Sequence, residues 1–232
     1  EVLNGLYGAL GMELGVIPCG SGNDFIKSFN HQERFHVIKE NLAFRARPVD
    51  LIQMNGCRLA INICSIGFDA SVAYRMEAFK RLPLVSGRMA YHLSLAYNLF
   101  GPLSKQATIQ LDEEEPYHGG VTLAAVCNGR CYGGGYYAGP RAVLDDGLLD
   151  VTVVKPVSHA TFVKLVGIYK QGEHLENEQI KPYLIVRRCK KVNVSVPAGT
   201  TTNADGECSL MNEVAFEVIP KGVLFAAPPD HL

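Results

Sequence analysis

Apolar residues occur at two different spacings along the chain, and the change comes near Pro48. Before it, apolar residues three and four positions apart predict an amphipathic helix over residues 1–10 and a helical tendency over residues 33–43. Residues 14–17 form a short apolar run typical of a buried strand. Pro18 ends this run because proline has no N–H for a ladder. The first part of the chain is therefore predicted to alternate helix and strand.

From residue 49 onward, short runs of β-forming residues are separated by turn residues, which is typical of an antiparallel sandwich or barrel. Asn55-Gly56 between two such runs is a strong hairpin signal. Helical spacing also predicts helices over residues 69–82, 88–100 and 159–171. The expected strands cover residues 49–54, 59–66, 107–111, 121–128, 148–155, 183–186, 192–196, 214–218 and 223–226. The fold class is therefore α+β overall, and its larger part is a mainly antiparallel, β-sandwich-like domain.

Charge and cysteine content limit the function classes. A net charge of −1 gives no whole-chain reason to expect a nucleic-acid partner. The seven cysteines form no CxxC pair and no zinc-ligand array, which favours reduced thiols in the cytoplasm. No apolar run approaches the roughly 18 residues that span a bilayer, so any membrane contact is expected to be peripheral. Lys80-Arg81 and the basic residues of 187–191 are either solvated faces or contacts to an anionic membrane.

Glycines follow the predicted strand 14–17. Gly20, Ser21 and Gly22 allow successive backbone N–H groups to converge on an anion. Asn23 or Asp24 is a good N-cap for a helix beginning near residue 25, and a helix N-terminus favours phosphate. The pattern therefore predicts a phosphate-binding turn, with an ordinary strand-to-helix turn as the alternative.

The same stretch resembles a family motif. Residues 18–25, Pro-Cys-Gly-Ser-Gly-Asn-Asp-Phe, resemble the Pro-x-Gly-Thr-Gly-Asn-Asp-Phe motif of the diacylglycerol kinase and sphingosine kinase family of lipid kinases, bacterial type. Ser21 replaces the usual Thr and keeps the hydroxyl. Residues 128–135, 144–150 and 205–207 resemble the family's Asn-Gly-x-x-x-Gly-Gly-Gly, Asp-Gly-Leu-Leu-Asp and Asp-Gly-Glu stretches in the family's order.

The start of the chain also fits this resemblance. Residues 1–5, Glu-Val-Leu-Asn-Gly, resemble a family helix that directly follows a Gly-Gly-Asp-Gly-Thr nucleotide loop. We therefore expect a fragment of a longer protein, inactive when isolated. The resemblance implies that residues 1–48, rejoined by residues 220–232, belong to a nucleotide-binding α/β domain. Residues 49–219 would form the β-sandwich-like domain.

The resemblance implies a structural Mg²⁺ in the 144–150 segment. Its ligands would be the Asp146 carboxylate and the main-chain carbonyls of Val143 and Leu148, with Asp50 connected through water. Without the resemblance, Asp146 belongs to an ordinary Asp-Gly turn and Asp50 is an acid at a strand start. Arg88, in a segment resembling a family helix start, either faces the transferred phosphate or is a surface cation.

Asp205-Gly206-Glu207 supplies the candidate base. Two carboxylates close together on one turn tend to raise one pKa, and kinase chemistry needs a proton acceptor for the attacking hydroxyl. The choice between Asp205 and Glu207 stays open at this point. The alternative is a solvated acidic hairpin tip.

The resemblance implies a peripheral lipid kinase that transfers the γ-phosphate of ATP to a lipid hydroxyl, with Mg²⁺ on the ATP as well. An NAD kinase-like enzyme and a non-catalytic lipid- or nucleotide-binding module are the alternatives. The expected partner is a lipid at the inner face of the membrane, with no nucleic acid and with a homodimer left open.

Overall fold

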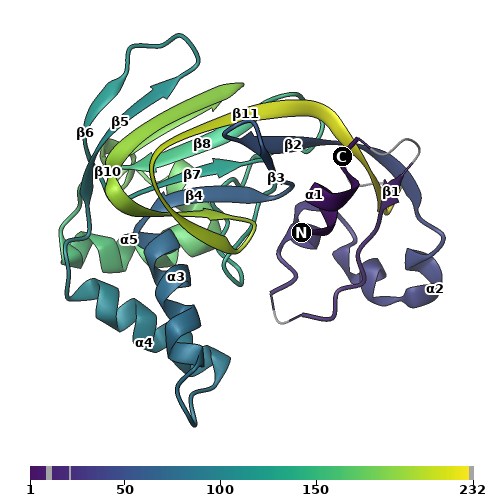
Figure 1. The fold of residues 1–232 in the computed structure, drawn as a ribbon, viewed down its shortest axis with the longest axis horizontal. Helices are drawn as coiled ribbons and strands as arrows, with labels where there is room; N and C mark the ends of the chain where they lie inside the picture. The colour runs from purple at the N-terminus through teal and green to yellow at the C-terminus, as the bar shows by residue number, and fades with distance from the viewer. Residues whose placement is uncertain (9–11, 21, 230–232) are drawn as a thin grey trace.

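The computed structural model describes residues 1–8, 12–20 and 22–229 of the chain. A large curved sheet with helices beside it is joined to a smaller lobe that holds the N-terminal segment (Figure 1). The strands are β1 (Glu13–Leu14), β2 (Arg45–Met54), β3 (Arg58–Ala60), β4 (Ile63–Gly67), β5 (Lys105–Leu111), β6 (Tyr117–Val121), β7 (Leu123–Cys127), β8 (Leu149–Val154), β9 (Leu184–Cys189), β10 (Lys191–Ala204) and β11 (Glu207–Ala227). The helices are α1 (Val2–Leu6), α2 (Ile38–Asn41), α3 (Phe68–Lys80), α4 (Gly87–Leu99) and α5 (His159–Gln171).

The strands form one sheet in the order β3-β2-β11-β10-β4-β7-β8-β9, with β5 between β10 and β6 and with β1 beside β11. The β1–β11 pair is parallel, and the other strand pairs of the described chain are antiparallel. The predicted α+β architecture, with a mainly antiparallel domain and a small α/β lobe, is therefore confirmed.

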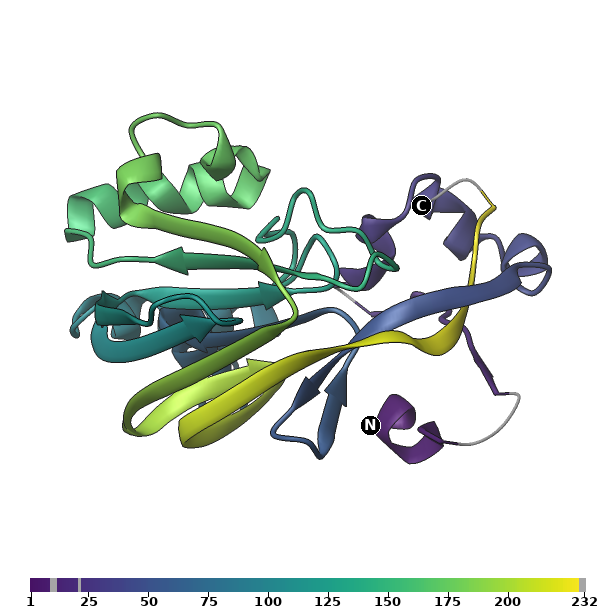
Figure 2. The same ribbon diagram turned by 90° about the horizontal axis from the view of Figure 1, so that it is seen from above.

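The core lies on both faces of the central strands. In β7, Ala124 and Val126 join the core enclosed by the curved sheet. Leu123, Ala125 and Cys127 instead join a second core that includes side chains of α5. Successive residues of a strand point to opposite faces, so full burial of β7 requires apolar residues at every position. Figure 2 shows α5 lying over the sheet, where it covers this outer face.

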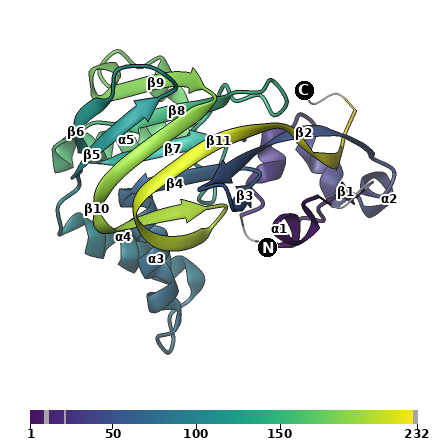
Figure 3. The same cartoon turned by 45° about the horizontal axis from the view of Figure 1, so that its top comes forward.

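Strands β2 and β11 run side by side from the large sheet into the smaller lobe (Figures 2 and 3). We predicted two strands over residues 214–226, but β11 is one strand of 21 residues. Its register against β2 shifts between Ile219 and Val223. Asp50 of β2 accepts a 2.6 Å hydrogen bond from the N–H of Lys221, which holds this bulge. The strand therefore continues past residues that locally favour a turn.

The smaller lobe is held by aromatic packing rather than by long helices. The rings of Phe29 and Phe225 stack with centroids 5.7 Å apart, and Phe25 meets Phe225 edge-on at 5.0 Å. The expected helix over residues 1–10 is shorter, because α1 ends at Leu6 and has no buried residue; residues 9–11 lie outside the described chain. Isolated helices of this length are unstable in water, so tertiary contacts decide their ends.

Several other expectations differ from the structure. The expected strand 14–17 is reduced to β1, and the helical tendency over 33–43 divides into the 3₁₀ turn η2 (Gln32–His36) and α2. The expected strand 59–66 divides into β3 and β4, and β6 was missed because its two glycines weaken the strand pattern. The helices predicted over 69–82, 88–100 and 159–171 are confirmed as α3, α4 and α5. Among the described residues, no helix has both the length and the apolar character needed to cross a membrane.

His174 is fully buried, 4.6 Å from the ring of Tyr169 by centroids. Burial lowers the pKa of His174 from 6.5 to about 4, with the backbone of Ala138 opposing the shift. The unfolded chain therefore binds the proton between these two pH values and the folded chain does not, so stability falls as pH falls.

We expect His174 to remove about 3 kcal/mol of unfolding free energy between pH 6.5 and pH 4. Urea unfolding of wild type and His174→Phe at several pH values measures this, and the variant should lose less stability on acidification. The exposed His36→Phe serves as the matched control and should keep the wild-type slope. Equal slopes in wild type and His174→Phe would contradict the assignment.

Candidate functional site

A cavity of about 610 Å³ lies between α3, α4, α5 and the strands β4 and β7. Most of its wall is apolar, with Val72 from α3, Leu95 from α4 and Phe162 and Leu165 from α5. Polar residues in the wall include Asp24, Asn62, Asp69, Glu77, Tyr91, Tyr132, Tyr136, Tyr169, Asn203 and Asp205. The cavity therefore combines a large apolar space with a few polar groups, as small-molecule sites do.

Asp69 and Tyr132 form one polar contact in this wall. The Tyr132 hydroxyl donates a 2.6 Å hydrogen bond to Oδ2 of Asp69, while Oδ1 finds no partner of ordinary hydrogen-bond geometry among the described residues. Burial raises the pKa of Asp69, and the hydrogen bond from Tyr132 opposes this rise. Sequence reasoning missed both residues. The available signal was an acid at the start of α3, directly after the buried strand β4.

The glycine-rich segment 133–135 closes another part of the wall. Gly133, Gly134 and Gly135 all have positive φ, which side-chain-bearing residues rarely adopt. The hydroxyls of Tyr136 and Tyr91 lie 2.8 Å apart, which links the end of this loop to α4. The loop is therefore fixed against the helix that lines the cavity.

Asp205 and Gly206 form the two-residue turn between β10 and β11. Both have positive φ (50° and 94°), as a type I′ hairpin turn requires. Oδ1 of Asn203 accepts a 2.7 Å hydrogen bond from the N–H of Gly206 and supports the turn. Asn203, Asp205 and Gly206 all line the cavity.

The Asp205 carboxylate anchors the break between β3 and β4. It accepts hydrogen bonds from the N–H groups of Ile61 (2.6 Å), Asn62 (3.0 Å) and Ile63 (3.0 Å). These three donors therefore find a partner where the β-ladder is interrupted. Desolvation raises the pKa of Asp205, while the three donors lower it. Desolvation, rather than the predicted repulsion between the two carboxylates of this turn, is the main cause that raises the pKa of Asp205.

Glu207 has a different environment. Its carboxylate pairs with Arg58 of β3, and its side chain is about half exposed at 48%. Glu207 does not contribute to the cavity wall within the described chain, whereas Asp205 does. The two candidate bases thus differ in their partners: Asp205 is held by backbone N–H groups, and Glu207 by the Arg58 guanidinium and, at 3.5 Å, by the amino group of Glu1.

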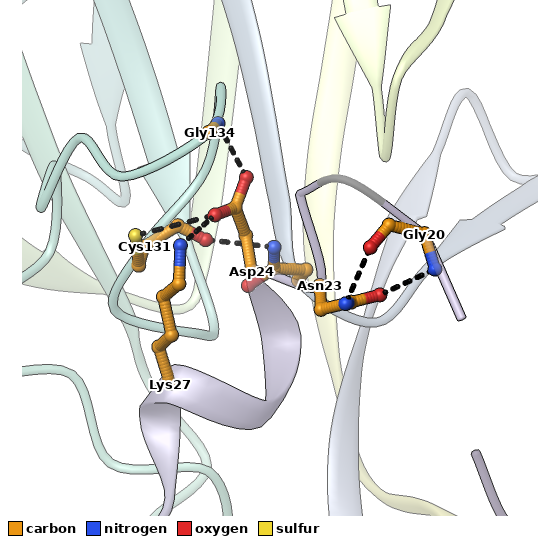
Figure 4. A network of polar contacts seen from close by, with 7 residues as sticks. Gly20, Asn23, Asp24, Lys27, Cys131 and Gly134 are labelled. Atoms are coloured by element: carbon orange, nitrogen blue, oxygen red, sulfur yellow. Dashed lines mark hydrogen bonds and ion pairs between the residues drawn. The ribbon is translucent and has the colours of Figure 1, made fainter. Parts of the chain in front are cut away.

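The predicted phosphate-binding turn is held by hydrogen bonds between its own residues. Asn23 has a left-handed backbone (φ 49°) and its amide exchanges hydrogen bonds with Gly20, at 3.1 Å from the Gly20 N–H and 2.7 Å to its carbonyl (Figure 4). Ser21 lies outside the described residues, and Gly22 lines the cavity. The helix expected after the turn is the four-residue 3₁₀ turn η1 (Phe25–Ser28), and neither Asn23 nor Asp24 caps it by a side-chain hydrogen bond.

Asp24 faces the glycine-rich loop instead. Its carboxylate accepts hydrogen bonds from the N–H of Gly134 (2.6 Å) and from Lys27 (2.7 Å), and the thiol of Cys131 lies 3.7 Å away (Figure 4). These contacts draw the carboxylate away from a cap position and join the turn to a loop more than 100 residues later. Asp24 thus connects two parts of the cavity wall.

Asp50 and Asp146 lie close together. The buried Asp50 accepts a 2.6 Å hydrogen bond from the N–H of Gly147, and burial raises its pKa, with a contribution from the charge of Asp146. Asp146 accepts a 3.0 Å hydrogen bond from the N–H of Leu148 and pairs with Arg188. Among the described residues, no three Asp, Glu, His or Cys side chains converge, so a cation here would also need main-chain carbonyls and water.

Arg88 lies in the first turn of α4, but its side chain is outside what the structure describes. The helix itself is capped by Ser86, whose hydroxyl accepts a 3.3 Å hydrogen bond from the N–H of Met89. The role of Arg88 therefore stays a prediction.

Two family models match the chain. The model described as "YegS C-terminal NAD kinase beta sandwich-like domain" matches residues 62–226, and the model described as "Diacylglycerol kinase catalytic domain" matches residues 1–54. Together they cover both lobes of the structure.

Similar curated proteins carry lipid kinase names. A "Probable lipid kinase YegS-like" of Shewanella frigidimarina is 29% identical, covering 94% of this chain and 68% of the relative. The diacylglycerol kinase of Bacillus subtilis is 28% identical, covering 89% and 67%. The chain thus spans about two thirds of the length of these relatives. In structure, a diacylglycerol kinase from Bacillus anthracis matches with a TM-score of 0.62 at 19% identity, covering 94% of this chain and 67% of that one, which shows a shared fold.

Replacing Asp205 by Ala should destabilise the protein by about 2 kcal/mol, because three backbone donors lose an ionised acceptor. Glu207→Ala is the matched control, because only Gly206 separates Glu207 from Asp205. It should change the free energy of unfolding by less than about 1 kcal/mol, since exposed ion pairs contribute little. Chemical denaturation of both variants measures the difference. A larger loss in Glu207→Ala than in Asp205→Ala would show that the anchor has been misplaced.

Proposed function

The chain belongs to the family of bacterial diacylglycerol kinase-like lipid kinases, as its motifs predicted, and on this premise we propose that its protein transfers the γ-phosphate of ATP to a lipid hydroxyl. The family implies a nucleotide substrate and a kinase reaction. The choice of ATP, of a lipid such as diacylglycerol, and of the residues that act on them is our proposal.

The cavity is the observation that best supports this proposal. Its apolar wall suits a hydrocarbon chain, since burial of each CH₂ group contributes about 0.8 kcal/mol. The Asp205-Gly206 turn and Gly22 of the predicted phosphate-binding turn belong to the same wall. A lipid bound there would bring its polar end near both segments. The phosphates of a dinucleotide would not match a wall of Phe, Leu and Val, which favours a lipid over NAD as acceptor.

We assign the base to Glu207, which begins β11 directly after the Asp205-Gly206 turn and is not itself in the described cavity wall, and a positioning role to Asp205. A general base needs a lone pair directed at the attacking hydroxyl. The oxygens of Asp205 already accept three backbone N–H groups, whereas Glu207 is half exposed and is held by two ion pairs, with Arg58 and, at 3.5 Å, with the amino group of Glu1. By fixing the turn, Asp205 would orient the start of β11 and with it Glu207.

The nucleotide phosphates would bind along residues 20–24. Gly20 and Gly22 leave room for close approach of phosphate oxygens, and the ring of hydrogen bonds between Gly20 and Asn23 gives the turn a defined shape. We propose that Asp24 acts through Gly134, by holding the glycine-rich loop against the turn, because its negative charge would repel phosphate at close range.

The Asp146 region fits Mg²⁺ in its chemistry, because its donors are carboxylate and carbonyl oxygens. Val143 and Leu148 would contribute carbonyls and Asp50 would act through water. The ion would neutralise the repulsion between Asp50 and Asp146 and stabilise the 144–150 segment. A second Mg²⁺ on ATP would neutralise charge on the phosphates.

Radiolabelled ATP and a panel of lipids test the proposed reaction with the purified full-length protein. We expect phosphate transfer to at least one lipid with a free hydroxyl, and Glu207→Gln should lower kcat about 100-fold or more while the KM for ATP changes little. Asp205→Asn should lower stability as well as activity.

Controls separate the roles. Glu213→Gln, which replaces an exposed acid farther along β11, should keep the wild-type kcat. Absence of transfer to every lipid, with transfer to NAD, would overturn the lipid assignment. A normal kcat with a raised KM for ATP in Glu207→Gln would make Glu207 a nucleotide contact.

Thermal unfolding in MgCl₂ tests the metal site without an activity readout. Mg²⁺ should raise the Tm of wild type by mass action and should have no such effect on Asp146→Ala. Arg188→Gln removes the ion pair but keeps the ligand, so its Tm should still rise with Mg²⁺. Equal responses in wild type and Asp146→Ala would remove Asp146 from the ligand set.

A further inference from the structure

Residues 128–130 lie where β2, the break between β3 and β4 and the smaller lobe meet, and we call this segment the junction. It directly follows β7 and precedes the glycine-rich segment 133–135. Asn128 is polar but fully buried, at 0% exposure. Because buried amides need hydrogen-bond partners, the contacts of Asn128 show which parts of the chain it holds together.

The side chain of Asn128 connects β2 to the break between β3 and β4. Its Nδ2 donates one 2.8 Å hydrogen bond to the main-chain carbonyl of Asp50 and another of 2.8 Å to that of Ile61. The N–H of the same Ile61 donates to the Asp205 carboxylate at 2.6 Å. Ile61 is therefore held by Asn128 through its carbonyl and by Asp205 through its N–H.

The backbone of the junction makes the same kind of contact to the next residue. The N–H groups of Asn128 and Gly129 both donate to the carbonyl of Asn62, each at 2.9 Å. The N–H of Asn62 donates to Asp205 at 3.0 Å, and its side-chain Nδ2 donates to the carbonyl of Cys131 at 2.9 Å. The residues that anchor the Asp205-Gly206 turn are thus the residues that the junction holds.

The end of the junction reaches the smaller lobe. The N–H of Arg130 donates a 2.9 Å hydrogen bond to Oγ of Ser28, which is 2% exposed. Ser28 ends η1, four residues after Asp24 of the predicted phosphate-binding turn. A Cβ on Gly129 would lie 2.9 Å from Oγ of Ser28 and 2.1 Å from Oδ1 of Asn62. A glycine is therefore required where these segments approach each other.

We propose that the junction aligns the predicted phosphate-binding turn with the Asp205-Gly206 turn, and that Asn128 is a positioning residue for phosphate transfer. This inference rests on the proposed kinase function and adds the residues that set the relative position of its two substrates. The phosphate would be held by the smaller lobe and the hydroxyl beside the Asp205-Gly206 turn. Reacting atoms must lie about 3–3.5 Å apart, and a misplacement of about 1 Å can lower the rate about 100-fold.

A role in stability alone fits these contacts less well. Oδ1 of Asn128 and Oδ1 of Asn62 are both buried without a hydrogen-bond partner among the described residues. A buried acceptor without a partner lowers the free energy of unfolding, so this arrangement sacrifices some stability. Its advantage is geometric, because one amide group donates to two carbonyls of separate segments, which neither a Leu nor an ionised Asp side chain can do.

Steady-state kinetics of the purified full-length protein test the proposal. Asn128→Ala removes both side-chain donors and should lower kcat for the lipid about tenfold or more, whereas the KM for ATP, and its Kd by calorimetry, should stay within about twofold. Asn41→Ala is the matched control, because the Nδ2 of Asn41 also donates to two main-chain carbonyls, those of Val16 (2.9 Å) and Phe35 (2.7 Å), but within the smaller lobe. It should lower the Tm similarly and keep the wild-type kcat at a temperature where both variants are folded. An equal loss of kcat in both variants would overturn the proposal.

Gly129→Ala tests the alignment while every donor and acceptor of the junction is kept. The added methyl group would push Ser28 and Asn62 apart, so kcat should fall as in Asn128→Ala. Gly167→Ala adds the same group to α5, where it would meet nothing within 4 Å outside its own stretch of helix, and should keep the wild-type kcat. A wild-type kcat in Gly129→Ala would contradict the alignment role.

Hydrogen exchange measured by mass spectrometry gives a readout that needs no lipid. In Asn128→Ala the amides of residues 61–63 and of residues 22–28 should both exchange about tenfold faster or more, because both segments lose a common support. In Asn41→Ala residues 61–63 should keep the wild-type exchange rate. Absence of transfer to any lipid would refute the proposed function, and faster exchange in both segments would still confirm the junction as their link. Faster exchange in neither segment, or in only one, would overturn the inference even if the kinase reaction is found.

Discussion

The hydrogen-bond ladders of β11 connect nearly every part of this protein. At its start, β11 pairs with β10 and carries the Asp205-Gly206 turn into the cavity wall. Farther along it pairs with β2, and at its end with β1 of the smaller lobe. Because buried backbone groups must find partners, a strand with neighbours on both sides fixes the register of all of them. The candidate base and the strand that precedes the predicted phosphate-binding turn are thus both attached to β11.

Two carboxylates stabilise the places where these ladders are interrupted. Asp205 satisfies the N–H groups between β3 and β4, and Asp50 satisfies Lys221 in the β11 bulge and Gly147 in the Asp146 segment. Ionised acceptors form stronger hydrogen bonds to backbone N–H groups than neutral ones do. Asp205 and Asp50, which the family resemblance associates with catalysis and metal binding, therefore also stabilise the fold. Substitutions at these positions will change stability and activity together, and both must be measured.

The sequence predicted those features that depend on neighbouring residues. The Asn55-Gly56 and Asp205-Gly206 turns, the three longer helices and most strands of the sheet follow local rules of spacing and backbone preference. The break expected between strands 214–218 and 223–226 does not occur, because β2 and Asp50 supply partners that local rules cannot reveal. The contact between Asp24 and Gly134 and the Asp69–Tyr132 pair join residues far apart in sequence, so no local pattern could reveal them. For the same reason the cavity could not be predicted from the sequence, because three helices and two strands that are far apart in the chain form its wall.

The β2–β11 ribbon also constrains how the two lobes can move. A single flexible linker would allow a hinge motion that opens and closes two lobes. Here two hydrogen-bonded strands, β2 and β11, pass between the lobes side by side. Bending such a ribbon within its plane stretches its ladder, whereas increasing its twist leaves the ladder intact, and two-stranded ribbons vary widely in twist. Relative motion of the lobes should accordingly be a rotation about the ribbon axis. Such a rotation would shift the predicted phosphate-binding turn relative to the glycine-rich loop that Asp24 contacts, so this contact limits how far the lobes can turn.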